Sequence, residues 1–246
     1  MTTQKPTVLV LGARSDIGRF VARRFAAAGH PVILAARRAD ELATSRDDIV
    51  ARSAVDCRLA EFDVCDPDPD AFFDRLGAMP GVVVMVAGLL GDQARSAGDT
   101  ATARQVLDTN FTGPTLFLLA AARRLEAGGG GTIVGISSVA GDRGRGSNYI
   151  YGGSKAGLTA ILSGMRNALA KRGVHVLTVK PGFVATQMTA GMKLPAALTA
   201  SPQQVADAIA KAVEKRRDVL YVLPVWRLIM GIITHIPERI FKTLKL

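Results

Sequence analysis

Cysteine, histidine and aromatic residues are scarce in this chain of 246 residues, and each scarcity argues against a class of protein. The two cysteines, Cys57 and Cys65, are too few for a disulfide framework, and their spacing matches no zinc signature. The three histidines are scattered, so no metal site is predicted. Aromatic residues make up 5% of the chain, and no basic run is interleaved with them to stack on bases. A nucleic-acid partner is therefore not expected.

Acidic residues are also in the minority, with 21 against 31 basic residues and a formal net charge of +10. Because the arginines are spread along the chain, we interpret the excess of basic residues as a solvated basic surface, with positive charge locally concentrated near an anionic ligand. A membrane surface is a second candidate partner. The N-terminus lacks a basic region followed by a long apolar segment, so no secretory leader is predicted and a cytoplasmic location is expected.

Apolar residues are abundant, at 48% of the chain, which is enough to bury one sizeable core. Strand patterns recur at 7–11, 31–36, 55–62, 81–86, 132–136, 175–179 and 219–222. Helical patterns lie between them, including 39–53, 100–127, 151–172 and 201–216. This alternation predicts an α/β fold, a single Rossmann-type domain over 1–225 with a doubly wound parallel sheet of about seven strands and helices on both faces. Residues 226–246 form a separate basic amphipathic tail in this interpretation.

The first strand leads into a glycine turn and then a helix, which is the context that a dinucleotide fingerprint requires. Gly12 permits the tight turn, and Gly18 permits close packing of the helix whose N-terminal N–H groups face a pyrophosphate. After the second strand, Arg37 and Arg38 stand where an acidic residue would bind the ribose 2′-hydroxyl of NAD. Arginine there accommodates a 2′-phosphate, and Arg14 can reach the same group. NADP(H) is therefore favoured over NAD(H), although merely solvated arginines would give the same pattern.

Tyr151 and Lys155 are four residues apart, so on a helix they share one face. An ammonium group near a phenol favours the phenolate, which lets the phenol act as an acid or base nearer neutral pH. Ser137 and Ser138 end the strand at 132–136, on the edge where open α/β sheets bind ligands. Tyr–Lys pairs at this spacing also occur on solvated helices. The pair therefore indicates a catalytic site only in combination with the serines and the glycine turn.

These motifs together resemble the short-chain dehydrogenase/reductase family, over the chain up to about Val222. The resemblance implies a catalytic tetrad of Asn110, Ser138, Tyr151 and Lys155. Ser138 matches better than Ser137 because it lies thirteen residues before the tyrosine, whereas Tyr149 lacks the four-residue spacing to the lysine. The implied cofactor contacts are Gly12, Arg14, Ser15, Asp16, Ile17, Gly18, Arg37, Arg38, Asp63, Val64, Ala87, Gly88, Tyr151, Lys155, Pro181, Gly182, Val184 and Thr186.

The reaction that the resemblance implies is reversible hydride transfer between nicotinamide and a carbonyl carbon. Tyr151 would exchange a proton with the substrate oxygen, and Lys155 would lower the tyrosine pKa and hold the nicotinamide ribose. Ser138 would hydrogen-bond the substrate oxygen, and Asn110 would hold a water that links the lysine to solvent. The alternative is a non-catalytic NAD(P)-sensing or scaffolding protein on the same fold, which a broken tetrad would favour.

Two departures from the family pattern concern the cofactor site. Asp16 replaces the usual middle glycine of the turn, and its charge is unfavourable beside a pyrophosphate unless it points away or caps the helix. Met85 and Val86 replace two asparagines before Ala87 and Gly88, which removes polar groups that help hold the cofactor loop.

The substrate side carries two weaker signals. Met188, Met192 and Leu194, within 186–200, suggest an adaptable apolar lid, and an ordinary surface helix explains them equally well. Arg143 and Arg145 lie in the loop before Tyr151, where they would meet an anionic group of the substrate unless they are simply solvated.

The tail from Trp226 to Leu246 has apolar residues at helical spacing and basic residues at Arg227, Arg239, Lys242 and Lys245. Such a helix lies in a membrane interface or packs on a neighbouring subunit of the homodimer or homotetramer that the family resemblance implies. A lid, an arginine at the mouth and a membrane-lying tail would suit a lipid-linked substrate. Reductases of polyprenyl-phosphate-linked keto-sugars resemble this chain in the altered glycine turn, in Gly91-Asp92-Gln93 and in the tail.

Overall fold

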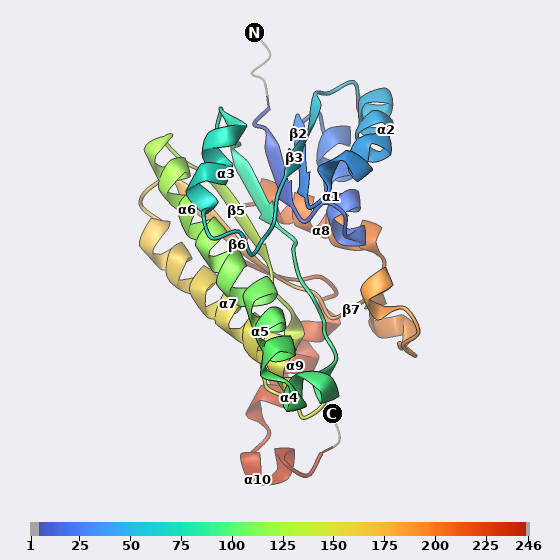
Figure 1. Cartoon of the computed structure of the whole chain (residues 1–246). Helices are drawn as coiled ribbons and strands as arrows, with labels where there is room; N and C mark the ends of the chain where they lie inside the picture. Colours follow the sequence, from blue (N-terminus) through green and yellow to red (C-terminus); the bar gives the residue numbers. More distant parts are fainter. Residues whose placement is uncertain (1–4, 245–246) are drawn as a thin grey trace.

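The computed structural model describes residues 5–244, and its centre is a sheet of seven parallel strands (Figure 1). The strands are β1 (Val8–Leu11), β2 (Val32–Ala36), β3 (Cys57–Glu61), β4 (Val82–Met85), β5 (Gly131–Ile136), β6 (Val174–Lys180) and β9 (Val219–Tyr221). Their order is β3-β2-β1-β4-β5-β6-β9, so the chain winds outward from β1 and then crosses back to β4 on its other side. The predicted doubly wound Rossmann-type fold is confirmed. Its switch point, where such sheets bind ligands, lies between β1 and β4.

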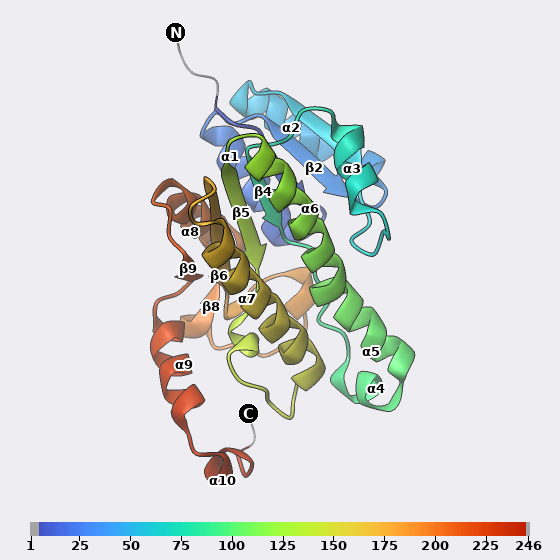
Figure 2. The same cartoon turned by 90° about the vertical axis from the view of Figure 1, so that its left-hand side faces the viewer.

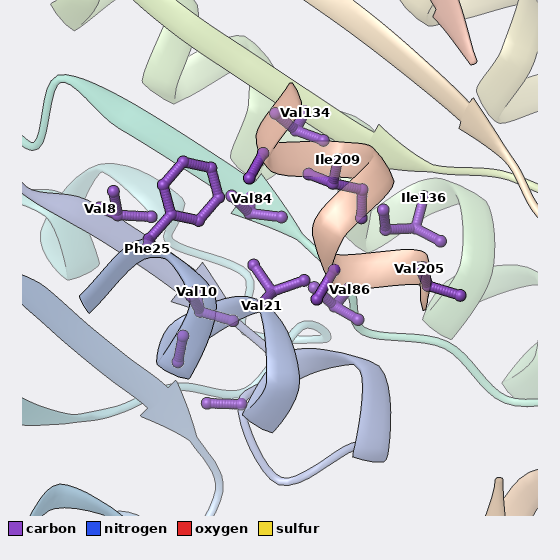
Figure 3. Packing of buried hydrophobic residues seen from close by; sticks show 14 of the residues in the cluster. Val8, Val10, Val21, Phe25, Val84, Val86, Val134, Ile136, Val205 and Ile209 are labelled. Atoms are coloured by element: carbon purple, nitrogen blue, oxygen red, sulfur yellow. The ribbon is translucent and has the colours of Figure 1, made fainter. Parts of the chain in front are cut away.

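Helices cover both faces of the sheet. The α-helices of the described residues are α1 (Asp16–Ala27), α2 (Ala43–Ser53), α3 (Pro69–Leu76), α4 (Gln93–Gly98), α5 (Thr100–Leu107), α6 (Gly113–Ala127), α7 (Tyr149–Leu169), α8 (Pro202–Glu214), α9 (Val225–His235) and α10 (Glu238–Phe241). Side chains alternate along β1, so Val8 and Val10 pack under α1, α2 and α8, while Leu9 and Leu11 pack under α3, α6 and α7. Figure 3 shows the first of these cores, where Phe25 and Ile209 approach the sheet from α1 and α8. Burial on both faces explains why the strands are continuous apolar runs in the sequence.

Three predicted helices differ in detail from the structure. The segment 39–53 is divided into a 3₁₀ turn at Ala39–Leu42 and α2. The segment 100–127 is interrupted by a π-helical turn, Asp108–Thr112, between α5 and α6. The helix predicted at 151–172 begins two residues earlier, at Tyr149, and ends at Leu169.

A second, two-stranded parallel sheet joins β7 (Phe183–Val184) to β8 (Thr199–Ala200). It was not predicted, because strands of two residues leave no periodic pattern in a sequence. The sheet closes the base of the 185–198 loop, so the predicted lid is anchored at both ends.

The C-terminal helices α9 and α10 lie beyond the carboxyl end of the sheet, at the opposite end of the molecule from α2 (Figure 2). In α9, Trp226 and Met230 are only 4% and 1% exposed, because they pack with Val139 and Phe183 in a small third core. No helix within residues 5–244 is both long enough and apolar enough to cross a membrane. Lys245 and Leu246, the end of the predicted tail, lie outside the described residues.

Candidate active site

The turn between β1 and α1 is closed by a serine and a glycine. Gly12 has a φ of +98°, and a Cβ there would lie 2.6 Å from the backbone nitrogen of Ala87. The Ser15 hydroxyl accepts a hydrogen bond from the Gly18 backbone N–H at 3.0 Å and donates to the Gly12 carbonyl at 2.8 Å. Ser15 is therefore the N-cap of α1, and the suggestion that Asp16 caps the helix is wrong. The tight turn therefore depends on both glycines lacking side chains, because a Cβ on either would collide with neighbouring atoms of the turn or of Ala87.

Asp16 instead joins the glycine turn to the lid. Its carboxylate accepts a hydrogen bond from the Gln187 backbone N–H at 2.7 Å. Thr186, the residue before, is part of the predicted nicotinamide segment. The charge that was expected to be unfavourable near a pyrophosphate is thus engaged with the lid, across 171 residues of sequence.

The predicted adenosine end of the cofactor site forms one pocket at the carboxyl ends of β1 to β4. Its lining includes nine of the residues expected there: Gly12, Arg14, Ser15, Arg37, Arg38, Asp63, Val64, Ala87 and Gly88. Arg14 and Arg38 both pair with Glu41, at 2.7 and 2.9 Å. Glu61, which the sequence analysis missed, accepts hydrogen bonds from the backbone N–H groups of Arg38 and Ala39, each at 2.9 Å. It thereby holds Arg38 in a left-handed conformation with a φ of 53°.

A second pocket adjoins the first at Gly88 and collects the predicted tetrad. Asn110 comes from the π-helical turn, Ser138 from the end of β5, and Tyr151 and Lys155 from α7. The same pocket is lined by further residues expected to contact the cofactor, namely Ile17, Pro181, Gly182, Val184 and Thr186. The four residues come from three segments of the chain, and the fold brings them to one cavity.

The two candidate serines have different surroundings. Ser137 donates to the Lys155 carbonyl at 2.9 Å and lies 2.6 Å from the Thr159 hydroxyl, so its hydrogen bonds tie β5 to α7. The Ser138 hydroxyl accepts from the Ala140 backbone N–H at 3.1 Å and its other hydrogen-bond partner is the Tyr151 side chain. This arrangement favours Ser138 as the residue that would meet a substrate.

Lys155 is 4% exposed, and its ammonium donates to the Ile136 carbonyl at 3.0 Å. Burial lowers the pKa of this lysine to about 8. Burial also raises the pKa of Tyr151, and hydrogen bonding to the Ser138 side chain acts in the opposite direction. The loss of water around the phenol outweighs the effect of the serine.

Asn110 is fully buried, and its amide group is engaged with the backbone. The side-chain nitrogen donates to the carbonyls of Leu89 and Val106, at 2.6 and 2.9 Å, and the side-chain oxygen accepts from the Leu89 N–H at 2.9 Å. This side chain therefore fixes the loop after β4. Met85 and Val86, which replace the family's asparagines in that loop, are buried in the two main cores.

Trp226 is a pocket residue that the sequence analysis assigned only to the tail. Its indole packs on Gly182, where a Cβ would lie 2.0 Å from the ring, and donates to the Leu198 carbonyl at 3.1 Å. The ring also makes an edge contact with Phe183, at 5.3 Å between centroids. One side chain from α9 thus contacts both the predicted nicotinamide loop and the lid.

The loop between Ser138 and Tyr151 carries two arginines that were expected at the substrate, and their side chains have different surroundings. Arg143 faces the tail, where it donates to the carbonyls of Ile233 and Ile236, at 2.7 and 2.6 Å. It also pairs with Glu238 at 2.8 Å and lies 3.7 Å from the centre of the Phe241 ring. The expectation that Arg143 meets the substrate is therefore wrong, because the C-terminal segment satisfies its guanidinium. Arg145 does line the catalytic pocket.

The lid contributes two methionines to the pocket. Met188 and Met192 line the cavity and remain about half exposed, as an adaptable cover would be. Leu194 does not reach the same cavity and lines a separate surface hollow beside α1.

Together, this sheet order, a glycine turn that opens α1 and a Tyr–Lys pair beside a strand-end serine define a dinucleotide-dependent oxidoreductase. A family model described as short chain dehydrogenase matches residues 6–196, so the chain belongs to the short-chain dehydrogenase/reductase family. An uncharacterised oxidoreductase of Mycobacterium tuberculosis is 39% identical over 220 residues, which cover 87% of each chain. One from Streptomyces coelicolor is 36% identical over 242 residues, or 97% of this chain and 95% of the relative.

Solved structures agree with this assignment. A short-chain dehydrogenase from Sphingobium yanoikuyae in complex with NADPH superposes with a TM-score of 0.81 at 26% identity. The superposition covers 95% of this chain and 97% of that one.

Proposed function

We propose that this oxidoreductase transfers hydride between NADP(H) and a carbonyl or secondary alcohol, with Asn110, Ser138, Tyr151 and Lys155 at the reacting centre. The observation that carries the proposal is the single cavity that holds all four side chains and adjoins the glycine turn. The bound nicotinamide would supply or accept the hydride, and the diphosphate would lie at the glycine turn, which Gly12 and Gly18 allow to pack closely against Ala87 and the start of α1.

The chain's own residues would move the proton. In reduction, the Tyr151 hydroxyl would donate a proton to the carbonyl oxygen, while Ser138 would hydrogen-bond the same oxygen as negative charge develops on it. Lys155, as an ammonium group below pH 8, would stabilise the resulting phenolate. Asn110 would act as a positioning residue, since its amide holds the Leu89 backbone beside the lysine.

The preference for NADP(H) rests on the two arginines that share Glu41. A 2′-phosphate would replace that carboxylate between Arg14 and Arg38, both of which are exposed enough to reorient. The NADPH complex of the Sphingobium relative supports the same cofactor. The first test is fluorescence titration of the purified protein with NADPH and with NADH, followed by NADPH oxidation in the presence of a panel of ketones.

Glu41→Gln is expected to tighten NADPH binding about three- to tenfold while NADH binding changes less than twofold. The substitution removes the carboxylate that competes for the arginines, and only NADPH carries the group that replaces it. Fluorescence titration of both cofactors measures the difference. Asp47→Gln, an exposed acid on α2 outside this pocket, is the control for net charge. Equal gains for both cofactors would contradict the assignment of the 2′-phosphate site.

The tail would contact either a membrane or a neighbouring subunit, and one experiment distinguishes the two contacts. Val225, Leu228 and Ile232 form an exposed apolar row on α9, with Leu228 and Ile232 at 68% and 61% exposure. The basic residues Arg227 and Arg239 are also exposed on this segment. A lipid-linked substrate would be consistent with such a surface beside the pocket.

The double variant Leu228→Glu, Ile232→Glu is expected to abolish the tail's contact while leaving the fold intact, because both side chains point to solvent. Loss of binding to anionic liposomes in a flotation assay, with unchanged mass in solution, would identify a membrane contact. A fall to the monomer mass by light scattering would identify a subunit contact. Deletion of the whole tail is unsuitable, since Trp226 belongs to the pocket wall. If neither property changes, the tail has no such role.

A further inference from the structure

A positively charged side chain lines the catalytic pocket without an acidic partner. The buried Nε of Arg145 has no hydrogen-bond partner within residues 5–244. The guanidinium reaches Met230, where Nη2 lies 3.4 Å from the thioether sulfur. Burial accordingly lowers the pKa of Arg145. A half-buried guanidinium whose neighbour is a thioether lacks the charge-assisted hydrogen bonds that usually offset its desolvation.

The acid nearest in the loop is already engaged. Asp142 accepts hydrogen bonds from the Lys180 ammonium at 2.5 Å and from the Tyr221 hydroxyl at 2.8 Å. The other loop arginine, Arg143, is satisfied by the tail. In the described part of the chain, the pocket lining therefore contains two cations, Arg145 and Lys155, and no carboxylate.

Asn148 adds a second free polar group to the same wall. Its backbone N–H donates to the Arg145 carbonyl at 3.1 Å, so the two residues belong to one turn. Its side-chain oxygen is buried and unpartnered within the described residues, although the residue occupies the N-cap position of α7. Both residues line the pocket, where the Arg145 guanidinium is the donor that an anion needs, whereas the Asn148 oxygen can only accept a hydrogen bond and does not contribute to anion binding.

We propose that Arg145 binds an anionic substituent of the substrate, a carboxylate or a phosphate ester. This rests on the proposed function, because it names the substrate class of the same pocket. A guanidinium binds either group through paired hydrogen bonds, which fix the orientation of the ligand as well as its position. Held in this way, the substrate would present its carbonyl to Ser138 and Tyr151. Arg145 is then a specificity-determining residue, distinct from the tetrad.

Two matched pairs of ketones test the proposal by calorimetry in the presence of saturating NADP⁺, so that no turnover occurs. One pair is 4-oxocyclohexanecarboxylate and its carboxamide, and the other is dihydroxyacetone phosphate and dihydroxyacetone. The charged member of at least one pair is expected to bind the wild-type protein about tenfold tighter or more. The pair that shows the preference distinguishes a carboxylate from a phosphate ester. Arg145→Met is expected to reduce the preference to less than about twofold. Arg227→Met, which removes a charge from the neighbouring surface outside this pocket, is expected to retain it.

The proposal is overturned if neither pair shows a preference in the wild-type protein, or if Arg145→Met keeps it. Should Arg145→Met fail to fold, Asn148→Asp provides a second route, since a carboxylate in this turn would pair with Arg145 and reverse the preference. Binding in the presence of NADP⁺ needs no hydride transfer. A charge preference without ketone reduction under NADPH would therefore contradict the proposed function and leave the role of Arg145 standing.

Discussion

Tyr151→Phe is expected to lower kcat/KM for ketone reduction by about 10³-fold or more, because the variant has no hydroxyl to donate to the carbonyl oxygen. The phenol shares the candidate cavity with Ser138 and Lys155, and burial raises its pKa and so favours its protonated form. Since the ring is retained, the pocket keeps its shape, and NADPH affinity should change less than about threefold.

Steady-state kinetics and cofactor titration on the same preparation separate these two effects. Tyr149→Phe is the matched control, because that tyrosine is half exposed on the same helix and should leave kcat/KM unchanged. Turnover of the Tyr151 variant within tenfold of the wild type would contradict the assignment of the proton donor.

Lys155→Met is expected to remove most activity, by about 10²-fold or more, and at the same time to raise stability at pH 7. The native pKa of Lys155 is about 8, below its ordinary value of 10.5, because its ammonium is buried without a carboxylate. Between these two values the unfolded chain binds a proton that the native protein has lost, so stability increases with pH across that window. Below pH 8 the native protein carries the full cost of the buried charge.

The variant lacks this cost and should therefore be more stable than the wild type at pH 7, by roughly 1–3 kcal/mol after loss of the hydrogen bond to Ile136. The difference should shrink as the pH approaches 10, which denaturant unfolding without cofactor at both pH values will show. Lys180→Met is the contrasting control, since that lysine has a buried acidic partner in Asp142 and its loss should destabilise the protein. A Lys155 variant that is less stable than the wild type at pH 7 would contradict the argument.

The sequence was sufficient for the features that depend on local spacing. Apolar runs placed the seven strands, and the four-residue interval between Tyr151 and Lys155 identified the helix face that lines the cavity. The arginines that follow β2 were placed at the adenosine end for the same reason, since they come directly after a strand. Strand edges and helix faces follow from periodicity, so residues attached to them could be located.

Side chains whose partners come from distant segments could not be located in the same way. Arg143 and Arg145 are two residues apart and chemically identical, yet carbonyls and an acid of the tail satisfy the first, while the second lines the pocket and reaches only the Met230 sulfur in α9. The difference arises from contacts some 90 residues further along the chain. Asp16 likewise finds its partner 171 residues away, and Glu61 acts through backbone groups that carry no sequence signal. Tertiary contacts of this kind are set by packing.

The position of Trp226 also has a consequence for the order in which the molecule can be assembled. All strands but β9 end by residue 200, so most of the sheet can form while the chain is still being synthesised. The wall beside Gly182 is completed only by an indole from α9, which follows the last strand of the sheet along the chain. A nascent or prematurely terminated chain would possess the nucleotide-binding half of the molecule without a finished pocket. Such a chain would be able to bind cofactor before it could position a substrate.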